Sequence, residues 1–177
     1  MTPPLALVAL GSNLGDPAAR LRAARSDLAE LGRIARSSSI YRTAPVGGPP
    51  GQPDYLNAVV ALEPRLGLAE PRSLLGALHE IERRHGRLRR LRWEARVLDL
   101  DLLALDELVR EEPEITLPHP RMMERSFVLV PLCEAVPEWR HPLTRESACE
   151  ALARLPMEGI ERTVLGWGDS RARRAET

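Results

Sequence analysis

Residues 98–102 read LDLDL, so leucine alternates with aspartate. Alternation with a period of two predicts a β-strand that carries its leucines on one face and Asp99 and Asp101 on the other. The chain continues as LAL at 103–105, which is apolar on both faces, so the acids lie at one end of a strand whose remainder is buried. Two carboxylates on one strand face suit either the solvated side of an edge strand or a pair of Mg²⁺ ligands.

The LDLDL strand closes a series of predicted elements. A strand is expected at 5–10 (LALVAL), a helix from Asp16-Pro17 to Gly32, strand-like sequence toward the end of 33–43, a strand at 55–64 (YLNAVVALEP), and a second helix from Glu70-Pro71 to Gly86. This order predicts an α+β protein with a ferredoxin-like βαββαβ sandwich. Past residue 115 we expect extra C-terminal strands and a helix near 144–154.

Composition sets limits on the class of protein. The chain has 177 residues, the size of one domain with its own core, and its 25 basic and 25 acidic residues cancel. Every basic residue is arginine, which excludes a P-loop lysine or a Schiff-base lysine. No apolar stretch is long enough to span a membrane, and Cys133 and Cys149 lack partners at zinc-site spacing. We therefore expect a cytoplasmic protein with reduced thiols.

An arginine-rich stretch runs directly into the paired acids. RRHGRLRRLRWEAR at 83–96 holds seven arginines in fourteen residues, a density that suits a solvated face, a nucleic-acid patch or a polyphosphate clamp. Its position beside Asp99 and Asp101 favours the clamp, because Mg²⁺ needs carboxylates and exposed phosphate oxygens need arginines.

A few aromatic and polar residues are candidates for binding a flat heterocycle. Tyr55, Trp93 and Phe127 either pack in the core or stack on such a ring. Asn57 lies two residues after Tyr55 on the same strand face and offers both a donor and an acceptor. His119, between two prolines, is either a phosphate contact or a loop residue.

Four stretches, in this order, resemble the 6-hydroxymethyl-7,8-dihydropterin pyrophosphokinase family of folate biosynthesis: ALGSNLGD (9–16), YRTAPVGGPPGQPDYLNAVVAL (41–62), EIERRHGRLRRLRWEARVLDLDLL (80–103) and LPHPRMMERSFVLVPLCEAVPE (117–138). The resemblance covers about residues 5–160. It implies a monomeric, ATP-dependent transferase that moves pyrophosphate from ATP to the pterin hydroxymethyl group, releases AMP and uses two Mg²⁺ ions. The zero net charge and the lack of a long apolar stretch argue against a nucleic-acid or a membrane partner.

The resemblance also implies roles for individual residues. The catalytic set is Arg87, Arg96, Asp99 and Asp101, of which the two aspartates bind the metal ions. The pterin set is Thr43, Ala44, Pro45, Val46, Gly47, Tyr55, Asn57, Trp93 and Phe127. The ATP set is Glu82, Arg87, Arg89, Trp93, Arg96, Leu102, Thr116, His119 and Arg125. We expect lids at 44–53 and 87–96, a pyrophosphokinase domain at 1–164 and a disordered tail at 165–177.

The chain departs from the family pattern at several positions. Glu94-Ala95 stands where members often have Gly-Pro, Glu114 where some have arginine, and Pro120 where a tyrosine is frequent. The last two place part of the ATP contact set in question.

Two other classes of protein share some of these features. A ferredoxin-like RNA-binding module would use the arginine stretch as its footprint, but the aromatics form no RNP-type motif and the net charge is zero. A metal-dependent nuclease would use Asp99 and Asp101, but it has no evident need for Tyr55, Asn57 and Phe127.

Overall fold

Strand β4 (Tyr55–Pro64) is the strand on which the sheet is assembled. In the computed structural model, which describes residues 4–46, 51–86 and 97–168, it pairs antiparallel with β1 (Ala6–Ser12), β2 (Gly32–Ser37) and β3 (Tyr41–Thr43). β1 also pairs with β5 (Asp99–Leu105), and β3 with β8 (Ile160–Arg162). The strand order is therefore β5-β1-β4-β3-β8, with β2 on β4 as well.

The two long helices begin at the predicted caps. α1 (Pro17–Leu31) starts after Asp16, whose carboxylate accepts a hydrogen bond from the Ala19 amide at 3.0 Å. α2 (Pro71–Arg84) starts after Glu70, which accepts from the Ser73 amide at 2.9 Å. Each helix has proline in its first turn, where the missing amide hydrogen leaves no bond unmade.

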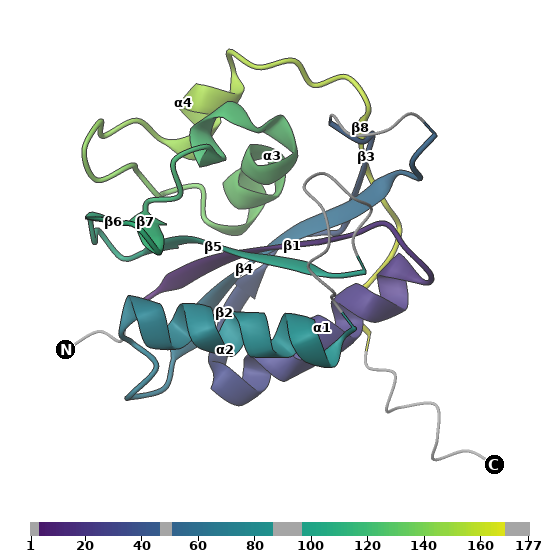
Figure 1. Ribbon diagram of the computed structural model, residues 1–177. Helices are drawn as coiled ribbons and strands as arrows, with labels where there is room; N and C mark the ends of the chain where they lie inside the picture. Colours follow the sequence, from purple (N-terminus) through teal and green to yellow (C-terminus); the bar gives the residue numbers. More distant parts are fainter. Residues whose placement is uncertain (1–3, 47–50, 87–96, 169–177) are drawn as a thin grey trace.

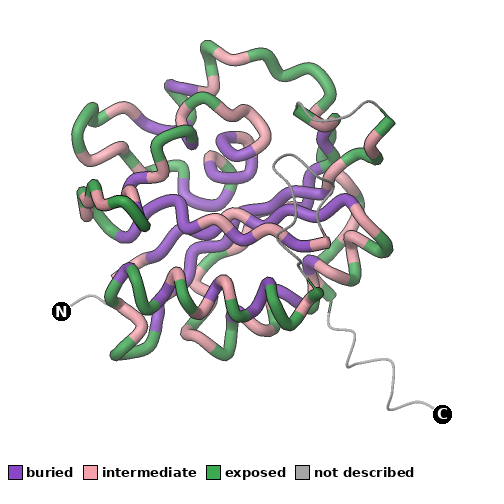
Figure 2. Tube along the Cα trace, viewed as in Figure 1, coloured by how far each residue is buried: buried purple, intermediate pink, exposed green. Residues whose placement is uncertain are grey.

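Helices cover both faces of the sheet. Figure 1 shows α1 and α2 on one side and α3 (Ser126–Ala135) and α4 (Ala148–Leu152) on the other. Each face has its own apolar cluster: Val8, Leu10 and Leu100 point toward α1 and α2, and Leu7, Val59 and Leu103 toward α3 and α4. Buried residues concentrate in the sheet between these layers (Figure 2).

The remaining elements lie between β5 and the C-terminal part of the chain. β6 (Arg110–Glu112) and β7 (Ile115–Leu117) form a small separate hairpin, and a 3-10 turn, η1 (Met122–Glu124), leads into α3. Cys133 and Cys149 are free thiols. Within the described ranges, no helix combines the length and apolar character that crossing a membrane requires.

Three expectations from the sequence need correction or completion. Residues 33–43 form two strands, β2 and β3, rather than strand only toward the end. Both pair with β4, and the ladder is interrupted at 38–40, where three residues lie opposite only two of β4. α3 was not predicted. The helix expected near 144–154 is confined to α4, where Ser147 and Glu150 form a reciprocal capping box.

Candidate active site

A row of residues crosses the sheet at the end where β1 stops. Gly11 of β1 lies opposite Asp99 of β5 on one side and Asn57 of β4 on the other, and Asn57 lies opposite Tyr41 of β3. Directly opposed residues project to the same face of a sheet, and here it is the face that carries α3 and α4. The register thus places an acid and a carboxamide on either side of a residue without a side chain.

The acid pair occupies the outer strand of the sheet, but the edge of that strand is covered. The Glu82 carboxylate, only 1% exposed, accepts a hydrogen bond of 2.7 Å from the Leu100 amide. The His119 amide donates to the Leu103 carbonyl at 2.7 Å. β5 is therefore held from both α2 and the segment before α3, and Asp99 and Asp101 project from a fixed backbone rather than from a free edge.

Asn57 is held in one orientation. It is 9% exposed, and its Nδ2 donates to Thr43 Oγ1 at 2.6 Å. A Cβ at Gly11 would lie 2.9 Å from Asn57 Oδ1, so the glycine leaves room for the amide at this point. The carboxamide therefore sits between β1 and β3 with its nitrogen tied to the strand that leads into residues 44–46.

Two more polar residues, which sequence reasoning passed over in the turn GSNLGD, hold segments on either side of this row. Ser12 donates to the Val97 carbonyl at 2.6 Å, two residues before Asp99. Asn13 donates to the Pro53 carbonyl at 3.2 Å, two residues before Tyr55. Both are buried. The available signal was the run of polar residues at the end of a strand that is otherwise apolar, since buried polar groups need partners.

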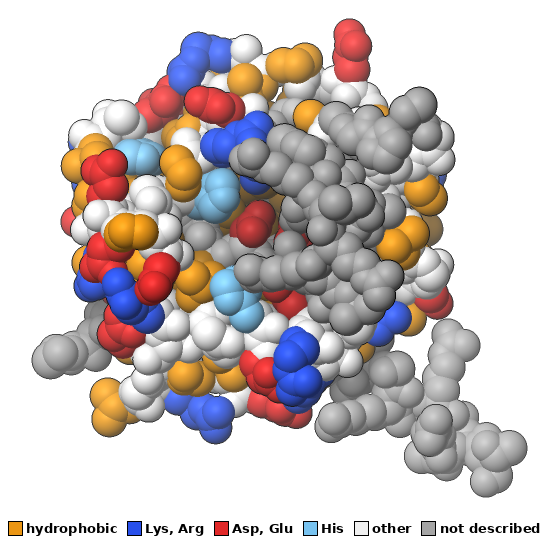
Figure 3. Space-filling view, viewed as in Figure 1, with side chains coloured by type: hydrophobic (Ala, Val, Ile, Leu, Met, Phe, Trp, Pro, Cys, Tyr) orange, Lys and Arg blue, Asp and Glu red, His pale blue; other side chains and the backbone are white. Residues whose placement is uncertain are grey.

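The start of α3 brings a cationic side chain to the acids. Arg125 Nη1 lies 4.0 Å from Asp101 Oδ2, and its guanidinium stands 5.8 Å from the centre of the Phe127 ring. The Asp101 side chain remains 37% exposed. On the face shown in Figure 3, acidic, arginine and histidine side chains gather near the centre of the molecule.

His119 approaches the same region along the edge of β5, where its amide donates to the Leu103 carbonyl. Burial, and then the charge of Arg125, lower its pKa below the usual value, while the charge of Asp99 opposes this shift. Its Nδ1 accepts a hydrogen bond from the Arg121 amide at 3.2 Å. A neutral imidazole with Nδ1 as acceptor carries its proton on Nε2, so that nitrogen is a donor.

The other predicted site residues are distributed around this centre. Thr43 pairs with Tyr55, the Ala44 amide donates to the Gly159 carbonyl at 3.1 Å, and Val46 is exposed. Leu102 is buried in the cluster under α1 and α2, and Thr116 lies in β7. Gly47, Arg87, Arg89, Trp93 and Arg96 lie outside the described residues, as do both stretches 47–50 and 87–96 of the expected lids.

The residue at one departure from the family pattern has a partner. Glu114 lies 3.0 Å from Arg72, which also pairs with Glu112. The hairpin β6–β7 is thereby tied to the first turn of α2. Glu114 therefore helps to attach the hairpin to α2.

The donor chemistry at the centre fits a metal ion bound together with phosphate. Within residues 4–46, 51–86 and 97–168, no group of three or more His, Cys, Asp or Glu is arranged to hold a metal ion. Asp99 and Asp101 supply hard oxygen ligands on one strand face, which suits Mg²⁺ when substrate phosphates complete its coordination. Fold and sheet register together define an α/β protein that carries a pair of acids and a buried carboxamide on one face of its sheet.

Comparison with known proteins identifies the family. Residues 7–137 match the model of the 7,8-dihydro-6-hydroxymethylpterin-pyrophosphokinase family. A 2-amino-4-hydroxy-6-hydroxymethyldihydropteridine pyrophosphokinase of Pseudomonas aeruginosa is 43% identical over 88% of this chain and 94% of its own length. One from Methylorubrum extorquens is 42% identical over 89% of this chain and 97% of its own. The chain belongs to this family, and its activity is that of a pyrophosphokinase of folate synthesis, a transferase.

Solved structures show the same fold. The wild-type HPPK-DHPS protein of Plasmodium falciparum with pteroate superposes with a TM-score of 0.71 over 91% of this chain, at 13% identity. The chain spans 48% of that protein, which is under half its length. At this identity the likeness concerns the fold alone.

Proposed function

We propose that the protein transfers the β,γ-pyrophosphoryl group of ATP to the hydroxymethyl oxygen of 6-hydroxymethyl-7,8-dihydropterin, with release of AMP. The observation that carries this proposal is the row Asp99, Gly11 and Asn57 across three neighbouring strands. In this proposal, Asp99 serves the phosphates on one side of Gly11 and Asn57 binds the heterocycle on the other. Two substrates bound on either side of Gly11 would meet without any movement of the sheet.

The pterin is proposed to bind beside Asn57. The Asn57 amide donates one of its two N–H groups to Thr43. Its second N–H and its oxygen can bind a ligand. The pyrimidine edge of a pterin presents donors and acceptors side by side, which such an amide can match. Tyr55 and Phe127 would contact the ring faces, and residues 44–46 would offer backbone groups, with Gly47 and Trp93 completing the set.

The triphosphate is proposed to lie along the arginine side of the row. Arg125, with its guanidinium near Asp101, and His119, with a donor at Nε2, suit phosphate oxygens. Arg87, Arg89 and Arg96 are proposed to spread further charge. Thr116 and the main chain at Leu102 would contact the nucleoside. Glu82, predicted for the ATP set, would support that site through its hydrogen bond with the Leu100 amide of β5.

Asp99 and Asp101 are the residues that would hold Mg²⁺, and we propose two ions. When bound, the metal neutralises charge on the triphosphate and helps to align it for in-line displacement. Strand β5 fixes the positions of the two carboxylates. The neighbouring Arg125 adds positive charge where negative charge develops.

In the reaction, the pterin hydroxyl oxygen forms a bond to the β-phosphorus of ATP. The bond from that phosphorus to the bridging oxygen of the α-phosphate breaks, AMP leaves with the electron pair, and the hydroxyl proton passes to solvent. Such a step requires alignment and charge neutralisation more than covalent help. The protein's part is therefore to hold the two substrates in line and to exclude water.

The finer architecture and setting are also part of the proposal. A ferredoxin-like core is supported by the order β1, α1, β2, β3, β4, α2, β5 and by the antiparallel neighbours of β1 and β4. We take the pyrophosphokinase domain predicted at 1–164 to include residues 165–168 as well, because Leu165 and Trp167 pack against its core. We take it to act as a monomer in the cytoplasm.

The product distinguishes this reaction from ordinary kinase chemistry. With Mg-ATP and hydroxymethyldihydropterin, AMP and the pterin diphosphate should form in equal amounts, measured by chromatography. Omission of the pterin should abolish AMP formation. Accumulation of ADP with a pterin monophosphate would refute the proposed transfer.

A further inference from the structure

The C-terminal segment 159–168, here called the strap, lies along the outer side of β3. Ile160 and Arg162 of β8 pair with Thr43 and Tyr41, and the Gly159 carbonyl accepts from the Ala44 amide at 3.1 Å. β3 has three residues and would otherwise be an edge strand. The strap therefore supplies the second hydrogen-bonding neighbour of the strand that leads into residues 44–46.

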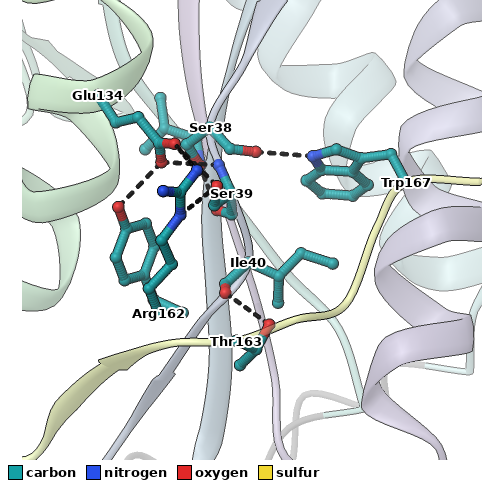
Figure 4. A network of polar contacts seen from close by, with 9 residues as sticks. Ser38, Ser39, Ile40, Glu134, Arg162, Thr163 and Trp167 are labelled. Atoms are coloured by element: carbon teal, nitrogen blue, oxygen red, sulfur yellow. Dashed lines mark hydrogen bonds and ion pairs between the residues drawn. The ribbon is translucent and has the colours of Figure 1, made fainter.

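On one face of the sheet the strap is fastened to α3. Glu134 accepts hydrogen bonds from the Ser39 amide at 2.7 Å, the Ser39 hydroxyl at 2.8 Å and the Tyr41 hydroxyl at 2.9 Å. Arg162 adds its Nη2 to the same carboxylate at 3.0 Å and its Nε to Ser39 Oγ at 2.8 Å. Figure 4 shows Arg162 and Glu134 pointing toward each other, with Ser39 beside them. One carboxylate thus joins α3, the start of β3 and the strap.

On the opposite face the strap is fastened to α1. Trp167 donates from its indole nitrogen to the Ser38 carbonyl at 2.7 Å, away from Arg162 (Figure 4). The Arg25 guanidinium stands 5.5 Å from the Trp167 ring centre, and Arg22 donates to the Gly166 carbonyl at 2.8 Å. The strap therefore crosses the sheet edge and is held in both helical layers.

We propose that the strap is a positioning device for the pterin site, with Gly159 and Arg162 as its positioning residues. The inference rests on the proposed function, because Thr43 is the residue that holds Asn57. The path is short: Gly159 binds Ala44, Ile160 pairs with Thr43, and Thr43 accepts from Asn57. Loosening the strap lowers the fraction of molecules in which Thr43 and Ala44 are in the binding position, and apparent pterin affinity falls by that fraction.

A pair of glycine substitutions tests the contact between the strap and Ala44. Gly159 and Gly67 both have positive φ, +72° and +95°, so alanine is strained at each. A Cβ at Gly159 would lie 3.3 Å from Ala44 Cβ, whereas a Cβ at Gly67 meets nothing within 4 Å. Gly159→Ala should raise the pterin KM by about three- to tenfold with kcat and ATP affinity nearly unchanged. Gly67→Ala should lower the melting temperature similarly and leave the pterin KM at its wild-type value.

A pair of arginine substitutions tests the fastening to α3. Arg162 and Arg33 have similarly exposed side chains, 66% and 68%. Arg162 forms an ion pair with Glu134 on α3, and Arg33 forms one with Glu63 on β4. Arg162→Met removes both donors to Glu134 and Ser39 but keeps the apolar stem, and the pterin KM should rise by about two- to fivefold. Arg33→Met breaks the pair with Glu63 on β4 and should leave that KM unchanged. Arg162→Lys, which keeps the charge, should fall between wild type and Arg162→Met.

Asn57→Ala, measured alongside, separates the two proposals. If it raises the pterin KM while Gly159→Ala and Arg162→Met do not, the pterin site stands and the strap has no positioning role. If Asn57→Ala is itself without effect, the proposed pterin site fails and the strap inference fails with it. Equal KM changes in the strap variants and their controls would also overturn the inference, because they would reflect stability alone.

Discussion

The Glu82 carboxylate, buried under α2, accepts the amide hydrogen of Leu100 at 2.7 Å, between the two aspartates of the site. The resemblance to the family implied a contact of Glu82 with ATP. Its burial favours a structural role, in which Glu82 fixes the backbone from which Asp99 and Asp101 project. A buried amide without an acceptor costs about 1–3 kcal/mol, so the acceptor contributes to stability as well as to alignment.

Substitutions at Glu82 separate these two roles. Glu82→Ala removes the acceptor and should lower both the free energy of unfolding and the turnover. Glu82→Gln keeps an acceptor of the same shape and should retain most of both. The measurements are urea unfolding and AMP formation. A stable Glu82→Gln variant with turnover as low as that of Glu82→Ala would mean that the charge itself acts on the substrates.

Gly11→Ala tests whether the row across the sheet needs an empty position. Its Cβ would lie 2.9 Å from Asn57 Oδ1, so the amide must move. A displaced amide leaves pterin groups unmatched, and pterin affinity should fall by about tenfold or more, with smaller effect on the nucleotide. Calorimetry with each ligand separately gives both values.

Gly76→Ala is the matched control. Gly76 lies inside α2, where a Cβ meets nothing within 4 Å, so alanine should stabilise the helix by about 0.5–1 kcal/mol and leave both affinities unchanged. Wild-type pterin binding by Gly11→Ala would show that the position of the Asn57 amide is not critical.

Elements with local signals were predictable from the sequence. The boundaries of β4 and the starts of α1 and α2 match expectation because alternation, caps and N-terminal prolines act over a few residues. α3 carries the opposite signals: its sequence SFVLVPLCEA contains Pro131 and is apolar without interruption from Phe127 to Cys133, so no helical stripe stands out. Packing against the sheet, which no local pattern encodes, decides its structure.

The site was predictable as a set of residues but not as a geometry. Asp99, Asp101 and Asn57 follow from residue types and resemblance, whereas the role of Gly11 depends on the register of three strands. The strap was missed because the sequence from 165 onward is polar and rich in small residues. Leu165 and Trp167 nevertheless pack against core residues that are distant in the sequence, and local composition does not predict such contacts.

Tyr41 predicts how stability depends on pH in the alkaline range. Burial first, and then its hydrogen bond to Glu134, raise the pKa of the phenol to about 12. Since the ordinary value is about 10, the folded state favours the protonated phenol. This contribution is complete below about pH 10 and is lost as the pH rises toward about 12.

Tyr41→Phe removes this titration. The variant should be less stable at neutral pH by about 1 kcal/mol, the value of one hydrogen bond. Above pH 10 the gap to wild type should narrow. Cys133, whose pKa burial also raises to about 12, is present in both proteins, and its charge adds to the rise in the pKa of Tyr41. Urea unfolding at a series of pH values measures the gap, and a constant difference would contradict the assignment.

Asp99 and Asp101 distinguish a functional acid pair from a solvated strand face. Two like charges on one face of a strand repel each other, which lowers the stability of the protein without metal. Asp99→Asn should therefore leave the apo melting temperature unchanged or raise it. Asp101→Asn should change it little, because Arg125 lies 4.0 Å from that carboxylate and already offsets part of its charge.

Activity should respond in the opposite direction. Either substitution removes an oxygen ligand with full charge, so Mg²⁺-dependent nucleotide binding should weaken and turnover should fall by about two orders of magnitude or more. Nucleotide binding without Mg²⁺ should change little, which separates loss of the metal site from damage to the pocket. The comparison requires melting curves without metal and turnover with Mg-ATP for both variants. Turnover near the wild-type value in both variants would show that the LDLDL aspartates are only a solvated strand face. The protein would then keep two repelling charges that lower its stability and contribute nothing to activity.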